Sequence, residues 1–139
     1  MNVRKQDLDV IAPVLVTFTI KQTSSVDDLK DANLGEPVTL SANGETGPIT
    51  DGGLLLGKLV GLTLTDKDDG DRLATVQVGG ICRLAIGTTF PVIGDRVVGA
   101  TAAKIKQAPI VASDPAGGNI ARGTVLSVNG TTDCMILLN

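Results

Sequence analysis

The chain has 139 residues, 42% of them apolar, which suits a single globular domain with a buried core. Its net charge is −3, and it contains no His, Tyr or Trp and only two Phe. An acidic chain without aromatic stacking platforms is not expected to bind nucleic acid. The longest apolar run near the start, residues 10–20, is too short to span a membrane, so no membrane partner is expected.

Residues 1–13 show no sustained hydrophobic period and end at Pro13. We therefore predict an N-terminal arm (1–13) ahead of a single β domain that spans residues 14–139. Asp7 and Asp9 stand where a secretory signal would carry basic residues, so we expect a protein that is made in a cytoplasm.

The first regular element is expected at residues 14–21. One face carries Val14, Val16, Phe18 and Ile20, and the other carries Thr17, Thr19 and Lys21. This period of two predicts a half-buried strand. Residues 24–33 are the one helical candidate, because Ser25 could cap the first turn and Asp28 follows three residues later. We expect at most one short surface helix.

The rest of the chain shows an internal repeat, approximately residues 35–83 and 94–138. Gly35-Glu-Pro-Val38 is echoed by Gly94-Asp-Arg-Val97, Gly61-Leu-Thr-Leu64 by Gly123-Thr-Val-Leu126, and residues 74–78 by residues 134–138. Each copy reads as turn, strand, loop, strand, tight hairpin and strand. Two such related β units and the leading strand predict an all-β fold, either a small β-barrel or a tulip-like or sandwich domain.

Charge is densest in the stretch LTDKDDGDR, residues 64–72. A calcium-binding EF-hand loop aligned on Gly70 would place Lys67 and Val76 at ligand positions, which excludes that motif. Asp69-Gly70 and, in the second copy, Asn129-Gly130 both favour tight hairpin turns. We interpret the stretch as a solvated hairpin tip that points outward. The alternative is a cation site of another kind, built from Asp66, Asp68 and Asp71.

The sequence predicts no catalytic residues. Without His, neither a Ser–His nor a Cys–His pair is available, and the commonest general base is missing. Cys82 and Cys134 fit no zinc-binding spacing and are expected to be buried, reduced, small apolar residues, with a disulfide between them as the alternative. The Gly-Gly pairs lack the spacing of phosphate-binding loops. We therefore expect no enzymatic activity and no cofactor.

Five motifs, taken in order, resemble the capsid cement (head decoration) proteins of phages. They are Gly35-Glu-Pro-Val38, Leu59-Val-Gly-Leu-Thr-Leu64, Ala74-Thr-Val-Gln-Val-Gly79, Gly94-Asp-Arg-Val97 and Cys134-Met-Ile-Leu-Leu138. The resemblance covers about residues 35–138. Where several such proteins carry an aromatic residue, this chain has Ile81 and Cys82. The resemblance implies a barrel or tulip-like domain, usually a homotrimer, that binds the outer surface of an expanded phage capsid and stabilises it by clamping adjacent subunits.

That resemblance makes the major capsid protein the expected partner. The expected location is the virion, on the outer capsid surface, after synthesis in the host cytoplasm. The expected contacts of the arm are Asn2, Val3, Arg4 and Lys5, and further candidates are Thr17, Thr19, Arg72 and Arg96. The alternative function is a ligand- or carbohydrate-binding β module with calcium held at residues 66–71. The shortage of aromatic residues counts against it.

Overall fold

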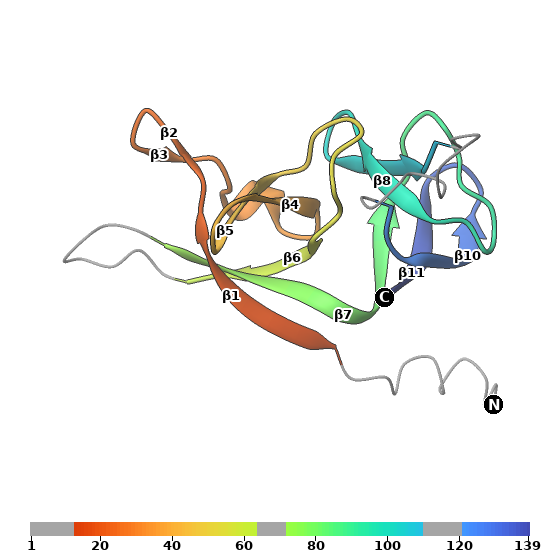
Figure 1. Cartoon of the computed structure of the whole chain (residues 1–139), viewed down its shortest axis with the longest axis horizontal. Coiled ribbons are helices and arrows are strands. Elements are labelled where there is room, and N and C mark those ends of the chain that lie inside the picture. Colours follow the sequence, from red (N-terminus) through yellow and green to blue (C-terminus); the bar gives the residue numbers. More distant parts are fainter. Residues whose placement is uncertain (1–12, 64–71, 110–120) are drawn as a thin grey trace.

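The computed structural model describes residues 13–63, 72–109 and 121–139, and these residues form an all-β fold (Figure 1). The strands are β1 Val14–Ile20, β2 Gln22–Thr23, β3 Val26–Asp27, β4 Pro37–Ala42, β5 Glu45–Pro48, β6 Gly57–Leu62, β7 Leu73–Ala85, β8 Val97–Ala100, β9 Lys104–Gln107, β10 Thr124–Asn129 and β11 Asp133–Leu138. A 3-10 turn, η1, covers Asp31–Asn33. The prediction of an all-β fold built around a small barrel is confirmed.

Five strands close into a barrel, which we call the first barrel. They follow the order β1, β5, β4, β6 and β7, and β1 pairs back onto β7. The pairing of β1 with β5, at Thr19 with Glu45 and Ile20 with Thr46, is parallel. The other pairs are antiparallel. Its core consists of Ile20, Leu29, Val38, Leu59, Ala74 and Val76.

The second half of β7 begins a second ring with the same order of neighbours, which we call the second barrel. β7 pairs with β11, β11 with β10, and β8 with β9. Single bridges, Val97 with Arg122 and a parallel one between Ile86 and Ile105, join the remaining neighbours. Strand β7 therefore belongs to both barrels, and Figure 1 shows it as the long ribbon that leads from one to the other. The second core consists of Ile49, Leu55, Cys82, Leu84, Ile86, Val97, Ile105, Val125, Cys134, Ile136 and Leu138.

The two barrels contain equivalent hydrogen bonds at matching positions. The N–H of Gly35 donates to the carbonyl of Leu59 (2.7 Å), and the N–H of Gly94 donates to the carbonyl of Val125 (2.8 Å). The β6–β7 and β10–β11 ladders shift register at the same point. The parallel bridge at Ile86 occupies the place of the β1–β5 pairing, so residues 80–86 take the position that β1 has in the first barrel.

The structure corrects one part of the sequence repeat. The ladders match Ala74 to Cys134, 60 positions later, as the sequence comparison has it. They match Lys58 to Thr124, 66 positions later, so Gly57 and not Gly61 corresponds to Gly123. The predicted correspondence of Gly61 with Gly123 in the sequence repeat is therefore wrong. The connection between β6 and β7 is six residues longer than the one between β10 and β11.

Close packing explains why glycine recurs at this corrected position. A Cβ on Gly57 would lie 1.9 Å from the carbonyl oxygen of Gln77, and a Cβ on Gly123 would lie 2.6 Å from Cγ2 of Ile136. Both distances are shorter than non-bonded heavy atoms tolerate. Glycine is thus required where β6 and β10 enter their hairpins against the facing strand.

The helical candidate at residues 24–33 does not form an α-helix, in agreement with the expectation of at most one short helix. The segment instead forms the β2–β3 hairpin, in which Ser24 and Ser25 have φ of 52° and 64°, followed by η1. Gln22 Nε2 donates to Asp27 Oδ1 (2.9 Å), so this side-chain hydrogen bond ties the two strands of the hairpin together. Leu29 alone reaches the core, and one buried apolar residue does not hold a helix face.

The strand expected at residues 14–21 is confirmed as β1, but its apolar face is only partly buried. Ile20 is buried, whereas Val16 is 40% exposed and its counterpart Cys82 only 5% exposed. Cys82 belongs to a core that also includes Ile49 and Leu55, from the connection between β5 and β6. Nothing precedes the first barrel among the described residues to supply such residues around Val16.

The connection between β5 and β6 joins the two barrels. The N–H of Gly52 donates to the carbonyl of Gly99 and the N–H of Gly99 to the carbonyl of Gly53, both at 2.8 Å. Lys106 Nζ lies 2.8 Å from Asp51 Oδ1. The guanidinium of Arg122 donates to the carbonyls of Leu55, Leu56 and Val78, and burial lowers its pKa. These contacts make one continuous interface rather than a flexible junction.

Candidate functional site

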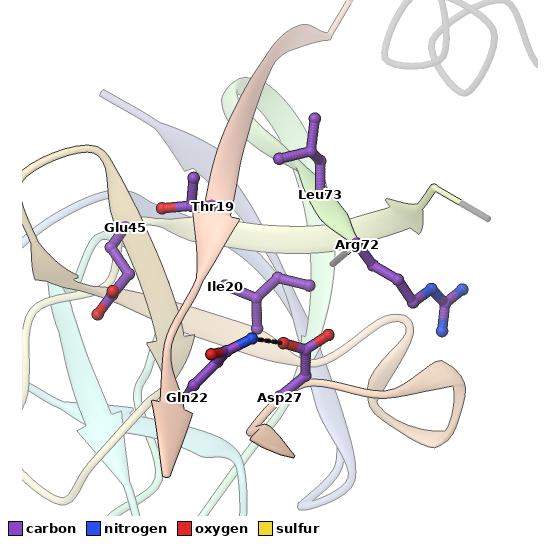
Figure 2. A pocket seen from close by; sticks show the side chains of 7 residues that line it. All are labelled: Thr19, Ile20, Gln22, Asp27, Glu45, Arg72 and Leu73. Carbon is purple, nitrogen blue, oxygen red and sulfur yellow. Dashed lines mark hydrogen bonds between the residues drawn. The ribbon is translucent and has the colours of Figure 1, made fainter. Parts of the chain in front are cut away.

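Each barrel has a hollow where the connection after its first strand approaches its last hairpin. The first hollow, of about 390 Å³, is lined by Thr19, Ile20, Gln22, Asp27, Glu45, Arg72 and Leu73 (Figure 2). The second, of about 450 Å³, is lined by Phe90, Pro91, Val92, Ile93, Val128 and Gly130. Because Arg72 corresponds to Thr132, two residues after Gly130, the two hollows lie at the same end of their barrels.

The first hollow is polar. Figure 2 shows Gln22 and Asp27 side by side, joined by their hydrogen bond, with Glu45 and Arg72 on opposite sides. Arg72 is already engaged: its Nη2 lies 2.8 Å from Asp31 Oδ1, and its Nε donates to the carbonyl of Thr63 (2.5 Å). The arrangement suits water or a small polar molecule. Among the residues that line it, no nucleophile is paired with a general base.

The second hollow is apolar and rigidly held. Phe90, Val92 and Ile93 are 48%, 61% and 73% exposed. Asp95 fixes this loop, because its Oδ2 accepts from the N–H of Val92 (2.8 Å) and its own N–H donates to the carbonyl of Val92 (3.0 Å). Three large apolar side chains are thus exposed to solvent on a loop whose backbone is fixed by hydrogen bonds, which is typical of a contact surface.

The loop before β4 and the loop before β8 make equivalent hydrogen bonds, so their residues can be matched one by one. The carbonyl of Asn33 accepts from the N–H of Glu36 as the carbonyl of Val92 accepts from that of Asp95. On this match Asp31 corresponds to Phe90, Asn33 to Val92 and Leu34 to Ile93. The β2–β3 hairpin of the first barrel has no counterpart in residues 87–93, where the connection is seven residues shorter. Equivalent ends of two related barrels therefore carry opposite chemistry.

Several residues singled out in the sequence lie outside the described residues. These are Asn2, Val3, Arg4, Lys5, Asp66, Asp68 and Asp71, whose roles stay predictions. Thr17 and Thr19 are exposed on β1, and Thr19 Oγ1 donates to the carbonyl of Gly44 (3.1 Å). Arg96 is exposed and donates to the carbonyl of Ala121 (3.2 Å).

The described part of the chain offers neither a grouped set of metal ligands nor a helix that could span a membrane. It contains no cluster of three or more carboxylate or thiol groups arranged to hold a metal ion. Nor does any helix within it reach the length and apolar character needed to cross a membrane.

Cys82 and Cys134 are free and buried, as expected. Burial raises the pKa of each thiol to about 11, which keeps both protonated near neutral pH. Their counterparts in the first barrel are Val16 and Ala74, since Cys82 pairs with Ile136 as Val16 pairs with Val76. Both cysteines occupy positions that the first barrel fills with small apolar residues.

The apolar loop was not identified from the sequence, although a signal was present. Residues 87–93, GTTFPVI, carry no charge and include one of only two Phe in the chain. Comparison with models of known protein families and with characterised proteins gives no match. The two hollows and the order of motifs are therefore the observations on which a function is proposed.

Proposed function

We propose that this chain is a capsid cement protein that binds the outer surface of an expanded phage capsid and clamps adjacent major capsid subunits. The observation that carries the proposal is the rigid apolar loop of the second barrel, exposed at one end of a body made of two fused barrels. The order of five motifs along residues 35–138 supports the same assignment. The protein acts by binding, without catalysis, and its site is on the virion surface.

Multivalency explains how modest contacts stabilise a shell. A homotrimer presents three copies of each surface, and once one copy is bound, the others act at high effective concentration. The N-terminal arm, with Arg4 and Lys5, adds a contact to a neighbouring subunit. Each contact remains individually weak, and the clamp as a whole is strong.

The proposal is tested by titrating purified protein into empty heads, expanded and unexpanded, and measuring bound protein by sedimentation. Saturable binding to expanded heads, with a trimeric mass in solution by light scattering, is the expected result. Absence of saturable binding to expanded heads, together with a monomeric mass, would contradict it. Heads loaded with the protein should also melt at a higher temperature than bare heads.

A ligand- or carbohydrate-binding module is the second candidate, favoured by the polar hollow of the first barrel. Arg72, which lines this hollow, directly follows the acidic residues 66–71. If these acids hold calcium, calcium should raise the melting temperature, and substituting Asn for Asp66, Asp68 and Asp71 together should abolish that rise. An unchanged melting temperature with calcium would count against this function.

A further inference from the structure

We propose that the apolar hollow of the second barrel, formed by Phe90, Val92, Ile93 and Val128, anchors this chain to a capsid subunit by seating an uncharged, aliphatic segment of that subunit. The inference rests on the proposed function, because it names the surface through which that function is performed.

The equivalent end of the first barrel differs from the hollow in the length of its connection. There the connection after β1 is seven residues longer, and it places Leu29, which follows the β2–β3 hairpin, in the core with 1% exposure. The second barrel has the same ring of strands but lacks the hairpin. Its end is left with exposed apolar side chains, which an extended segment that carries an aliphatic side chain would cover.

The surroundings of the hollow select against charge. Residues 87–93 and 127–132, which form its two sides, contain no Asp, Glu, Lys or Arg. A charged side chain seated here would lose water without gaining an ion pair, which is costly. The seated segment is therefore uncharged where it touches Val92 and Ile93.

The size of the surface favours a capsid subunit over a second copy of this chain. Three side chains exposed to this degree present a few hundred Å² of apolar surface, about the largest patch that a typical monomer shows. A stable pairwise interface needs about 800 Å² from each partner. The patch is too small to hold two copies together alone, but it suits one contact in a multivalent clamp.

The rigidity of the loop lowers the cost of docking. Asp95 holds Val92 from both sides, and Gln107 Nε2 donates to the same carboxylate oxygen (3.0 Å). Pro91 is buried, which fixes the loop between Phe90 and Val92. Little conformational freedom remains to be lost when a partner binds.

The test compares Ile93→Asp with Leu34→Asp, the substitution at the corresponding position of the first barrel. Leu34 is 46% exposed, so both variants should fold and melt like the wild type. We expect Ile93→Asp to weaken binding to expanded heads by about tenfold or more, because a seated aliphatic side chain is replaced by a charge. Leu34→Asp should bind within about twofold of the wild type.

Val92→Thr serves as a second variant that keeps the shape of the loop, and it should weaken binding in the same direction. Wild-type affinity for heads in both Ile93→Asp and Val92→Thr overturns the inference while leaving the cement function standing. A change in solution mass in Ile93→Asp overturns it in favour of a second copy as the occupant. Failure of the wild type to bind expanded heads overturns both the function and the inference.

Discussion

Replacing Arg122 by Leu, the side chain that corresponds to it in the first barrel at Leu56, should break the main polar contact between the barrels. The guanidinium donates to the carbonyls of Leu55, Leu56 and Val78. Hydrogen bonds from a charged group contribute about 1.5–3 kcal/mol each. Desolvation of the guanidinium, which lowers its pKa, offsets part of that gain. We therefore expect a loss of about 2–4 kcal/mol in the free energy of unfolding.

The assay is urea unfolding followed by far-ultraviolet circular dichroism, since the chain has no Trp or Tyr. The matched control is Arg83→Leu. Arg83 Nη1 lies 2.5 Å from Asp133 Oδ1, but the Arg83 side chain is half exposed. Its removal should therefore lower the free energy of unfolding by less than about 1 kcal/mol. If Arg122→Leu costs no more than Arg83→Leu, the reasoning is refuted. A second transition in Arg122→Leu alone would show that this contact couples the unfolding of the two barrels.

Three further predictions concern packing, titration and the arm. Gly57→Ala should lower the free energy of unfolding in urea by about 3 kcal/mol or more, because its Cβ would overlap the Gln77 carbonyl. Gly61→Ala should cost well under half as much, since a Cβ at Gly61 would lie 3.8 Å from Cβ of Thr75. Equal losses in the two variants would contradict the packing argument. Both thiols have a folded pKa near 11, raised from 9.0, so they contribute stability that is complete below pH 9 and is lost as the pH rises toward 11. At about pH 10 the loss should be about 1–2 kcal/mol per thiol, and a Cys82→Val, Cys134→Ala variant should lack it; an unchanged pH profile in this variant would contradict the assignment. Deleting residues 2–11 should weaken binding to heads while leaving the melting temperature nearly unchanged, whereas an equal loss of both would show that these residues belong to the core.

Much of the fold was predictable because it depends on local patterns. Alternation along β1 and the turn chemistry of Asn129-Gly130 identify strands and a hairpin directly. Register was harder, because similar Gly-rich motifs align at more than one offset. Only the paired ladders show that Gly57 corresponds to Gly123. The helical candidate at residues 24–33 failed because side chain contacts within a hairpin use the same residue types as a helix cap.

The candidate site was less predictable, because it depends on whether the apolar residues 90–93 are buried or exposed in the fold. The run Phe90-Pro-Val-Ile93 reads as a core segment, since apolar residues are usually buried. Its exposure accompanies a shorter connection in the second barrel, a difference visible only when the two rings are matched. The dense charge of residues 64–72 is the stronger signal in the sequence, whereas the exposed apolar side chains of residues 90–93 become evident only in the structure.

Strand β7 has a consequence for how the protein is oriented on whatever it binds. It passes through both barrels without a linker, and it turns at Gly80, whose φ is 88°. Two modules on a flexible tether must each lose rotational freedom when they bind. On the proposed function, docking at the second barrel would also set the direction of the first, whose polar end would then be aimed without a further entropic cost. The shared strand would carry a pulling force from one barrel to the other through its backbone instead of through a flexible hinge.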